Sequence, residues 1–232
     1  MKKAILFGAS GFIGSHLLQE LLNNNDYEQV TIVVRKKQNS THPKLKTLIG
    51  DIHTLPQLKE SIIGDEIFIA LGTTKKHTPN EKEYYQIDHD YPVLAAKTAK
   101  ENGAKSVFVV TAVGANSNSS IFYTKTKGEV ERDIIGLDFV HTHIFEPSMI
   151  VGNRKEYRPG EKTIIKIFKV INPLLVGKLN KYKGIDGRDI AKAMNNAAKN
   201  QSEKVKIYQW HEMNGLVYKF PTTRKSIFKE YI

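Results

Sequence analysis

A glycine-rich turn near the start of the chain constrains the fold more than any other feature. Residues 8–14 read GASGFIG and stand between the apolar run Ala4–Phe7 and a segment with leucines at helical spacing. Gly8 permits a tight turn, Gly11 lets backbone amides approach phosphate groups, and Gly14 lets the helix pack close to the strand. A strand, turn and helix in this order set the positive end of the helix dipole against a bound diphosphate. The turn therefore predicts a dinucleotide-binding site.

Short apolar runs alternate with amphipathic segments over the first 150 residues. Most of the runs are continuous stretches of apolar and β-branched residues, as strands buried on both faces require. We therefore expect an α/β fold built on a doubly wound parallel sheet, the Rossmann fold, in residues 1–150. The alternation fades after Ile150, so residues 151–232 are expected to form a small C-terminal substrate lobe, packed on the core as one structural unit. The expected strands are Ala4–Phe7, Val30–Val34, Thr47–Ile49, Ile67–Leu71, Ser106–Val110 and Phe139–Phe145, and the expected helices are Ile13–Asn23, Leu55–Ile62, Tyr91–Asn102 and Phe122–Ile135.

The composition narrows the kinds of site and location. The chain of 232 residues contains no cysteine, which excludes disulfides, thiolate zinc sites and cysteine nucleophiles. Its eight histidines show no metal-ligand spacing, and we expect no metal. No run approaches the roughly 18 apolar residues that span a bilayer. We expect a cytoplasmic monomer or homodimer with no membrane span.

The chain is strongly basic, with 35 Lys and Arg against 24 Asp and Glu and a net charge of +11. Such a charge is compatible with a nucleic-acid or anionic-membrane partner. The aromatic residues, however, do not interleave with the lysines as a base-stacking platform would require. The composition therefore disfavours nucleic acid, and we attribute the charge to solubility and to attraction of an anionic cofactor.

The residue after the second expected strand indicates which dinucleotide binds. NAD-preferring sites usually carry Asp or Glu there, which accepts hydrogen bonds from the ribose hydroxyls and would repel a 2′-phosphate. Here the position is Arg35, followed by Lys36 and Lys37. A guanidinium can hold a 2′-phosphate through paired charge-assisted hydrogen bonds. We predict NADP(H), with NAD(H) as the alternative cofactor and a solvated basic turn as the alternative interpretation of the motif.

Two further strand ends are expected to line the same crevice. Asp51 and Ile52 follow the third strand, where a carboxylate commonly meets the adenine amino group, although Asp51 could instead cap the turn. Leu71 ends the fourth strand, and Gly72 and Thr73 follow it, in a segment of mostly small residues. Small residues let the backbone line the ribose and diphosphate. A plain strand-to-loop turn explains this second segment equally well.

Tyr123 and Lys127 form a Y-x-x-x-K pair at the start of an expected helix. Residues four apart share one helix face. A free tyrosine titrates near about pH 10, and a neighbouring cation favours the phenolate. Tyr123 would then be the general acid and base at a substrate oxygen, while Lys127 would also hydrogen-bond the nicotinamide ribose. The spacing alone is a frequent accident in a lysine-rich chain, but its place after the fifth strand and downstream of the glycine turn favours this role.

Six motifs occur in a family-specific order: GASGFIG at 8–14, Arg35-Lys36, LGTT at 71–74, IDHDY at 87–91, YTKTKGEVE at 123–131 and YRPGE at 157–161. With them the chain resembles the short-chain dehydrogenase/reductase superfamily of the extended type. More closely, it is similar to the HIV Tat-interacting (TIP30-like) oxidoreductases and their bacterial relatives. The similarity covers about the first 160 residues, and the tail resembles the family more loosely.

The resemblance implies hydride transfer to or from a small carbonyl or alcohol, and it places Pro147 beside the nicotinamide. Two positions depart from the family pattern. Thr111 stands where relatives often carry serine, and it either polarises the substrate carbonyl or caps its strand. Glu146 replaces an arginine, a charge reversal that alters the substrate's charge or diminishes activity. The expected catalytic residues are Tyr123, Lys127 and Thr111, and the expected cofactor-binding residues are Gly8, Ser10, Gly11, Phe12, Ile13, Gly14, Arg35, Lys36, Asp51, Ile52, Leu71, Gly72, Thr73, Tyr123, Lys127 and Pro147.

Three other features receive structural interpretations. We expect Asp88 to support the helix that packs beside the active-site helix, and Asp189 to act as a helix N-cap. The basic segment Lys162–Lys183 is interpreted as an amphipathic helix over the crevice, with a lid for anionic substrates or a lipid-contacting surface as alternatives. The predicted function is that of an NADP(H)-dependent oxidoreductase. The alternative is a regulatory protein that senses NADP(H) with little or no turnover.

Overall fold

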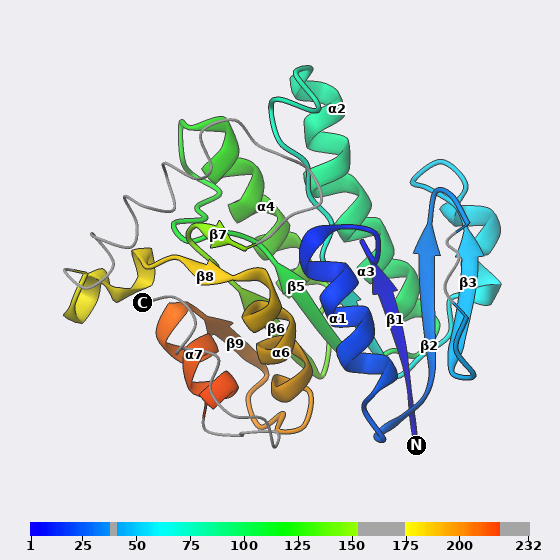
Figure 1. The fold of residues 1–232 in the computed structure, drawn as a ribbon. Helices are drawn as coiled ribbons and strands as arrows, with labels where there is room; N and C mark the ends of the chain where they lie inside the picture. Colours follow the sequence, from blue (N-terminus) through cyan, green and yellow to red (C-terminus); the bar gives the residue numbers. More distant parts are fainter. Residues whose placement is uncertain (38–40, 153–174, 219–232) are drawn as a thin grey trace.

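Parallel strands form the main sheet of the protein (Figure 1). The computed structural model describes residues 1–37, 41–152 and 175–218. The strands of this sheet are β1 (Lys2–Phe7), β2 (Tyr27–Val34), β3 (Leu45–Ile49), β4 (Glu66–Ile69), β5 (Ser106–Val110), β6 (His141–Phe145) and β9 (Val205–Tyr208). Within the described ranges their order is β3-β2-β1-β4-β5-β6-β9, so the chain starts inside the sheet and builds outward on both sides. The expected doubly wound α/β sheet is confirmed.

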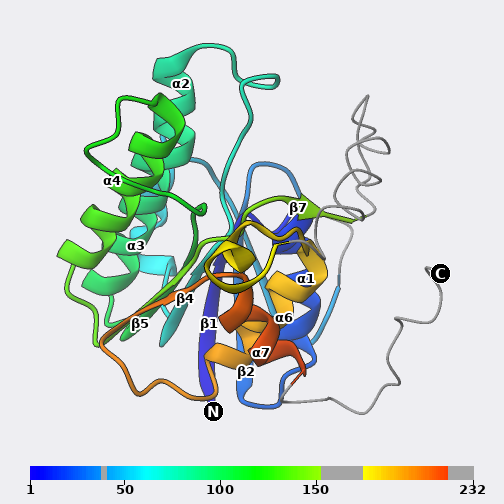
Figure 2. The same ribbon diagram turned by 90° about the vertical axis from the view of Figure 1, so that its left-hand side faces the viewer.

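Helices cover both faces of this sheet. They are α1 (Phe12–Leu22), α2 (Glu81–Tyr85), α3 (Tyr91–Glu101), α4 (Phe122–Gly136), α6 (Gly187–Ala197) and α7 (Trp210–Tyr218), with a π-helical turn η2 (Gln86–Asp90) between α2 and α3. Figure 2 shows α2, α3 and α4 on one side and α1, α6 and α7 on the other. None of the helices in the described ranges is long and apolar enough to cross a membrane.

The core consists of two layers, one on each face of the sheet. In β1, Ala4 and Leu6 are buried with residues of α1 and α6, whereas Ile5 and Phe7 are buried with residues of α3 and α4. The inner strands of the sheet must therefore be apolar on both faces. This double burial explains why the central strands read as continuous apolar runs rather than as alternating ones.

The described part of the C-terminal segment extends the main sheet. β9 pairs in parallel with β6, and α6 packs against α1. The sequence analysis missed β9 because this short edge strand is interrupted by Lys206 and exposes Val205 and Ile207. Two short strands, β7 (Ile150–Val151) and β8 (Ile185–Asp186), pair with each other in a separate small sheet. The division into a core and a substrate lobe at residue 150 stays a prediction.

One local expectation is refined and another is wrong. The expected helix Leu55–Ile62 is present as a 3-10 helix, Leu55–Ser61, with Pro56 in its first turn. The N-cap of α6 is Asp186 rather than Asp189, because the Asp186 carboxylate accepts a hydrogen bond of 2.8 Å from the Arg188 amide. Asp189 lies one turn later, where burial raises the pKa of its carboxyl and the charge of Asp186 adds to the rise.

The glycine turn joins β1 to α1 through two close backbone approaches. Gly8 has a φ of +86°, and its carbonyl oxygen accepts a hydrogen bond of 2.9 Å from the Gly11 amide. At Gly14 a Cβ atom would overlap the Gly8 carbonyl group, so α1 starts closer to the strand than any side chain allows. The position of the helix N-terminus therefore depends on these glycines.

We expect Gly14→Ala to destabilise the protein by about 1–3 kcal/mol, because the added methyl must displace the Gly8 carbonyl. Gly136→Ala is the matched control: it lies in α4 with no atom within 4 Å of a built Cβ. Alanine there favours the helix by up to about 1 kcal/mol. Urea unfolding measures both changes. Equal stabilities for the two variants would contradict the close packing at the turn.

Candidate active site

The N-terminus of α1 has the features of an anion-binding site. Ser10 and Gly11 are exposed, and Gly11 is the N-cap residue, with no side-chain hydrogen bond from the cap among the described residues. This end of the helix is the positive end of its dipole, where an anion is favoured. A Cβ atom on Gly11 would lie 3.3 Å from the Gly8 carbonyl oxygen and would crowd the turn. These residues fit the diphosphate of a dinucleotide.

Phe12 and Ile13 direct their side chains away from this turn. Ile13 is buried in the core. The Phe12 ring fills the space that a Cβ on Gly187 would take, and it also lies against Gly152. Both residues can therefore offer only backbone amides to a cofactor, while the Phe12 ring connects α1 to the segments around β7 and β8. The sequence pattern could not distinguish these two roles.

Arg35 and Asp51 lie at the same edge of the sheet, just after β2 and β3. The charges of both residues affect the phenol of Tyr91. Its pKa is raised to about 12, mainly by burial and in part by Asp51, while Arg35 opposes the rise. Arg35 and Lys36 are exposed. Asp51 caps the turn before the 3-10 helix, since its Oδ1 accepts a hydrogen bond of 2.9 Å from the His53 amide. Turn capping, left open by the sequence, is thus a role that Asp51 performs.

A buried ion pair stands at the centre of the carboxyl edge of the sheet. Lys127 Nζ lies 2.8 Å from Asp88 Oδ2, and their side chains are 7% and 1% exposed. The other carboxylate oxygen, Oδ1, accepts a hydrogen bond of 2.6 Å from the Thr73 amide. Gly72 lies beside the pair, because a Cβ there would be 3.7 Å from Asp88 Oδ1 and 3.9 Å from Lys127 Nζ. The pair connects the end of β4, the π-helical turn and α4.

Tyr123 lies one helical turn before Lys127 and is 43% exposed. Burial of part of its side chain and, to a lesser extent, the negative charge of Asp88 together raise the pKa of the phenol to about 12. The sequence predicted the opposite direction. The main reason for the difference is burial, which disfavours the charged phenolate; in addition Asp88 pairs with Lys127, so the lysine does not act on Tyr123 as an isolated cation.

Thr111 follows β5, and its hydroxyl is engaged by an acidic residue of α4. Thr111 Oγ1 donates a hydrogen bond of 2.5 Å to Glu131 Oε1. Burial raises the pKa of the Glu131 carboxyl to about 7, and the charge of Glu146 adds to the rise, whereas the Thr111 hydrogen bond and Lys127 oppose it. Glu146, at the end of β6, is buried and accepts a hydrogen bond of 2.8 Å from Gln209 Nε2. Burial also raises the pKa of Glu146.

Three further predicted residues, Ile52, Leu71 and Pro147, follow strands β3, β4 and β6. Leu71 and Ile52 are partly buried against the core layer that contains α3 and α4. Pro147 is buried, and its carbonyl oxygen accepts a hydrogen bond of 3.1 Å from the Val113 amide. Most of the basic segment Lys162–Lys183 lies outside the described residues.

Sequence reasoning missed two members of this cluster. Asp88 was assigned a supporting role, although it is the ion-pair partner of Lys127. Glu131 was part of a motif but received no role. The spacing of the sequence could have identified Glu131. Tyr123, Lys127 and Glu131 stand four residues apart and therefore share one face of α4.

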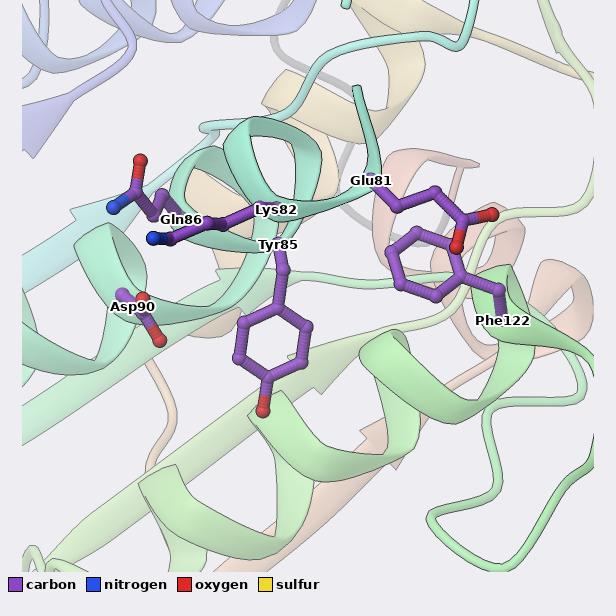
Figure 3. Close-up of a pocket in the computed structure, with 6 residues that line it drawn as sticks. All are labelled: Glu81, Lys82, Tyr85, Gln86, Asp90 and Phe122. Atoms are coloured by element: carbon purple, nitrogen blue, oxygen red, sulfur yellow. The ribbon is translucent and has the colours of Figure 1, made fainter. Parts of the chain in front are cut away.

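Two surface pockets border the region. One, of about 420 Å³, lies between α2 and α4 and contains none of the predicted site residues; Figure 3 shows Tyr85 and Phe122 on its wall. The other, of about 370 Å³, is lined in part by Lys181, Gln209 and Glu212. Because Gln209 donates a hydrogen bond to Glu146, the second pocket adjoins the buried carboxyl of Glu146.

Comparisons with known proteins show the family to which the chain belongs. A family model described as NAD(P)H-binding matches residues 8–141. Protein FMP52 of Candida glabrata, described as mitochondrial, is 30% identical over 203 residues, which is 87% of each chain. Protein HTATIP2 of Rattus norvegicus is 31% identical over 171 residues, covering 72% of this chain and 70% of the relative. The resemblance to the Tat-interacting group is confirmed.

Solved structures share the fold. MoeE5 in complex with UDP-glucose and NAD superposes with a TM-score of 0.65 and 16% identity, covering 91% of this chain and 79% of that one. A UDP-N-acetylglucosamine 4-epimerase from Methanobrevibacter ruminantium has a TM-score of 0.66 and 19% identity, covering 90% and 76%. At such identities the likeness concerns the fold alone.

The expected cytoplasmic location is wrong in the light of these relatives. FMP52 proteins of Candida glabrata, Eremothecium gossypii, Aspergillus fumigatus and Candida albicans are all named as mitochondrial. The expectation rested on the lack of an apolar span. This feature does not report on the organelle in which a protein works.

We expect Asp88→Asn to destabilise the protein by about 3–5 kcal/mol, because it leaves the Lys127 ammonium buried without a counter-charge. Asp138→Asn is the matched control. Asp138 pairs with Lys204 at 2.7 Å, but both side chains are exposed, and asparagine tolerates its φ of 59°. This control should cost less than about 1 kcal/mol. Urea unfolding of both variants checks the difference, and similar losses would contradict the buried pair.

Proposed function

The chain belongs to the NAD(P)H-binding family of Rossmann-type proteins, and from this premise we propose that it is an NADP(H)-dependent oxidoreductase that interconverts a small carbonyl compound and its alcohol. One observation carries the proposal. Lys127 is held 2.8 Å from a buried carboxylate, one helical turn after Tyr123, at the same edge of the sheet as the glycine turn. Proton chemistry and a dinucleotide site therefore adjoin each other.

The residues at the strand ends would hold the cofactor. The glycine turn and the N-terminus of α1 would bind its diphosphate, and Arg35 with Lys36 would bind the 2′-phosphate of NADP(H). Leu71, Gly72 and Thr73 would border the sugar that carries the nicotinamide. When bound, the nicotinamide supplies or accepts a hydride.

Tyr123 would exchange the proton that accompanies this hydride. Its pKa of about 12 keeps the phenol protonated at neutral pH, which supports its use as the acid in carbonyl reduction. In that direction the phenol O–H bond breaks and the proton passes to the substrate oxygen. The resulting phenolate would lie one helical turn from the Lys127 ammonium, whose charge is shared with Asp88.

The second pocket is our candidate for the substrate's entry. Its lining includes Lys181 and Gln209, and Gln209 donates to Glu146 at the end of β6. A substrate in this pocket would approach the edge of the sheet where Thr111 and Glu131 lie. The buried acids Glu131 and Glu146 favour an uncharged substrate oxygen over a carboxylate at this position.

One observation favours a second candidate function, a regulatory protein that senses NADP(H). The Thr111 hydroxyl, which would polarise a substrate carbonyl, already donates to Glu131. A site whose donor is occupied in this way would bind the cofactor and turn over slowly. Measurement of turnover separates the two functions.

Tyr123→Phe should lower the rate of NADPH-dependent carbonyl reduction by at least about 100-fold, because the variant lacks the proton donor. Tyr85→Phe is the control: the pKa of Tyr85 is also raised to about 12, chiefly by burial, but this residue lines the pocket between α2 and α4. Loss of NADPH absorbance with a panel of aldehydes and ketones gives the rates. Equal rates for wild type and Tyr123→Phe would eliminate the tyrosine mechanism.

Arg35→Ala should weaken NADPH binding by about 10- to 100-fold, because the variant loses a charge-assisted hydrogen bond to the 2′-phosphate. NADH lacks this phosphate, so its affinity should change by less than about twofold. Lys37→Ala, two residues further on, should leave both affinities close to those of wild type. Isothermal titration calorimetry measures all six dissociation constants. Equal losses for NADPH and NADH in Arg35→Ala would show that the residue does not select the cofactor.

A further inference from the structure

The Thr111 hydroxyl has one proton, and the structure shows where that proton goes. It is donated to Glu131 Oε1 over 2.5 Å, a length typical of a hydroxyl bound to an ionised carboxylate. The next acceptor, the Phe145 carbonyl oxygen, is 3.4 Å away. A hydroxyl can donate only once. While Glu131 is ionised, Thr111 therefore has no proton to offer to a substrate oxygen.

Glu131 faces a small set of charged groups. Lys127 precedes it by one turn of α4, and Glu146 approaches from the end of β6. Both neighbours have partners of their own: Lys127 pairs with Asp88, and Glu146 accepts from Gln209. Glu131 is partly buried, and the like charge of Glu146 disfavours its ionisation.

A carboxylic acid reverses the hydrogen bond that a carboxylate accepts. A protonated Glu131 would donate its O–H to Thr111 Oγ1, and the threonine would keep its own proton free to rotate toward another acceptor. The distance between the two oxygens suits both arrangements. The direction of the Thr111 hydroxyl therefore depends on one proton held by Glu131.

We propose that Glu131 is a positioning residue that controls whether Thr111 can donate a hydrogen bond to the substrate oxygen. This inference rests on the proposed function, because it assigns Thr111 the polarising role in that reaction. When Glu131 is ionised, its carboxylate accepts the hydrogen bond of the Thr111 hydroxyl, which then cannot donate to the substrate. When Glu131 is protonated, the Thr111 hydroxyl can donate to the substrate oxygen. Glu131 keeps its proton throughout, and Tyr123 supplies the one that reaches the product.

The proposal sets the sign of a pH dependence. The pKa of Glu131 is raised to about 7, so the acid is present below this value and is lost above it. Carbonyl reduction should therefore fall as pH rises, by about tenfold per pH unit above the midpoint. The phenol of Tyr123 stays protonated over this range and does not produce the fall.

Glu131→Gln tests the proposal because its amide donates to Thr111 at every pH. We expect kcat for reduction to be independent of pH between about 6 and 8.5, and at pH 8.5 to exceed the wild-type value by about 30-fold. Glu146→Gln removes the like charge and should shift the wild-type profile to lower pH. Thr111→Val has no hydroxyl and should be slow at every pH. A Glu131→Gln profile that falls as steeply as the wild-type profile would overturn the proposal.

A titration without turnover keeps the proposal separate from the proposed function. The side-chain carboxyl ¹³C signal of Glu131, assigned by its loss in Glu131→Gln, should titrate near pH 7 in the free protein. Thr111→Val should raise this midpoint, because the threonine hydrogen bond stabilises the ionised form. A titration midpoint of Glu131 at about 4.3, the value of an ordinary glutamate, would overturn the coupling between Glu131 and Thr111. A midpoint that Thr111→Val leaves unchanged would overturn it as well. Wild-type protein that titrates as expected but reduces no carbonyl compound would instead contradict the proposed function.

Discussion

The ion pair between Asp88 and Lys127 is the interaction on which the candidate site depends. Two opposite charges, almost fully removed from water, lie 2.8 Å apart, and the Thr73 amide satisfies the second carboxylate oxygen. Burial of a charge is costly without such partners. The pair therefore fixes the end of β4, the π-helical turn and α4 relative to one another, and with them the position of Tyr123.

The π-helical turn gives Asp88 its place in this arrangement. It lies between α2 and α3, where one wider turn interrupts an otherwise continuous helix. Such turns are rare and occur frequently at functional sites. Here the turn carries both Asp88 and His89, and His89 lies 2.9 Å from Asp133 of α4. The same segment thus contacts α4 at two levels, once beside the candidate site and once further along the helix.

The side chains at the carboxyl edge of the sheet differ in their protonation states near neutral pH. Tyr123 is kept protonated by burial and by Asp88, whereas Glu131 is close to the pH at which it changes charge. Thr111 connects the second group to the place where we expect the substrate. The acid that donates the proton and the group that sets the hydroxyl direction are therefore different residues on one helix face.

The sequence predicted the parts of this site that depend on local pattern. The glycine turn, the apolar strands and the Y-x-x-x-K spacing each lie within a short window, and periodicity reveals them. The pairing of Asp88 with Lys127 joins residues that are far apart in the chain, and nothing in either neighbourhood indicates it. Phe12 is a similar case, because its ring packs on glycines that follow it by more than a hundred residues. Edge strand β9 was missed because Lys206 interrupts its short run of apolar residues, so that it lacks the continuous pattern of the inner strands.

Direct transfer of hydride tests the central claim most sharply. NADPH that carries deuterium on the transferred position of the nicotinamide would be incubated with stoichiometric protein and a reducible carbonyl compound, and the alcohol would be analysed by mass spectrometry. Our account predicts one deuterium on the carbinol carbon with the wild-type protein and none, over the same time, with Tyr123→Phe. Deuterium that stays on a cofactor shown by calorimetry to be bound would contradict the account and would identify the protein as a sensor.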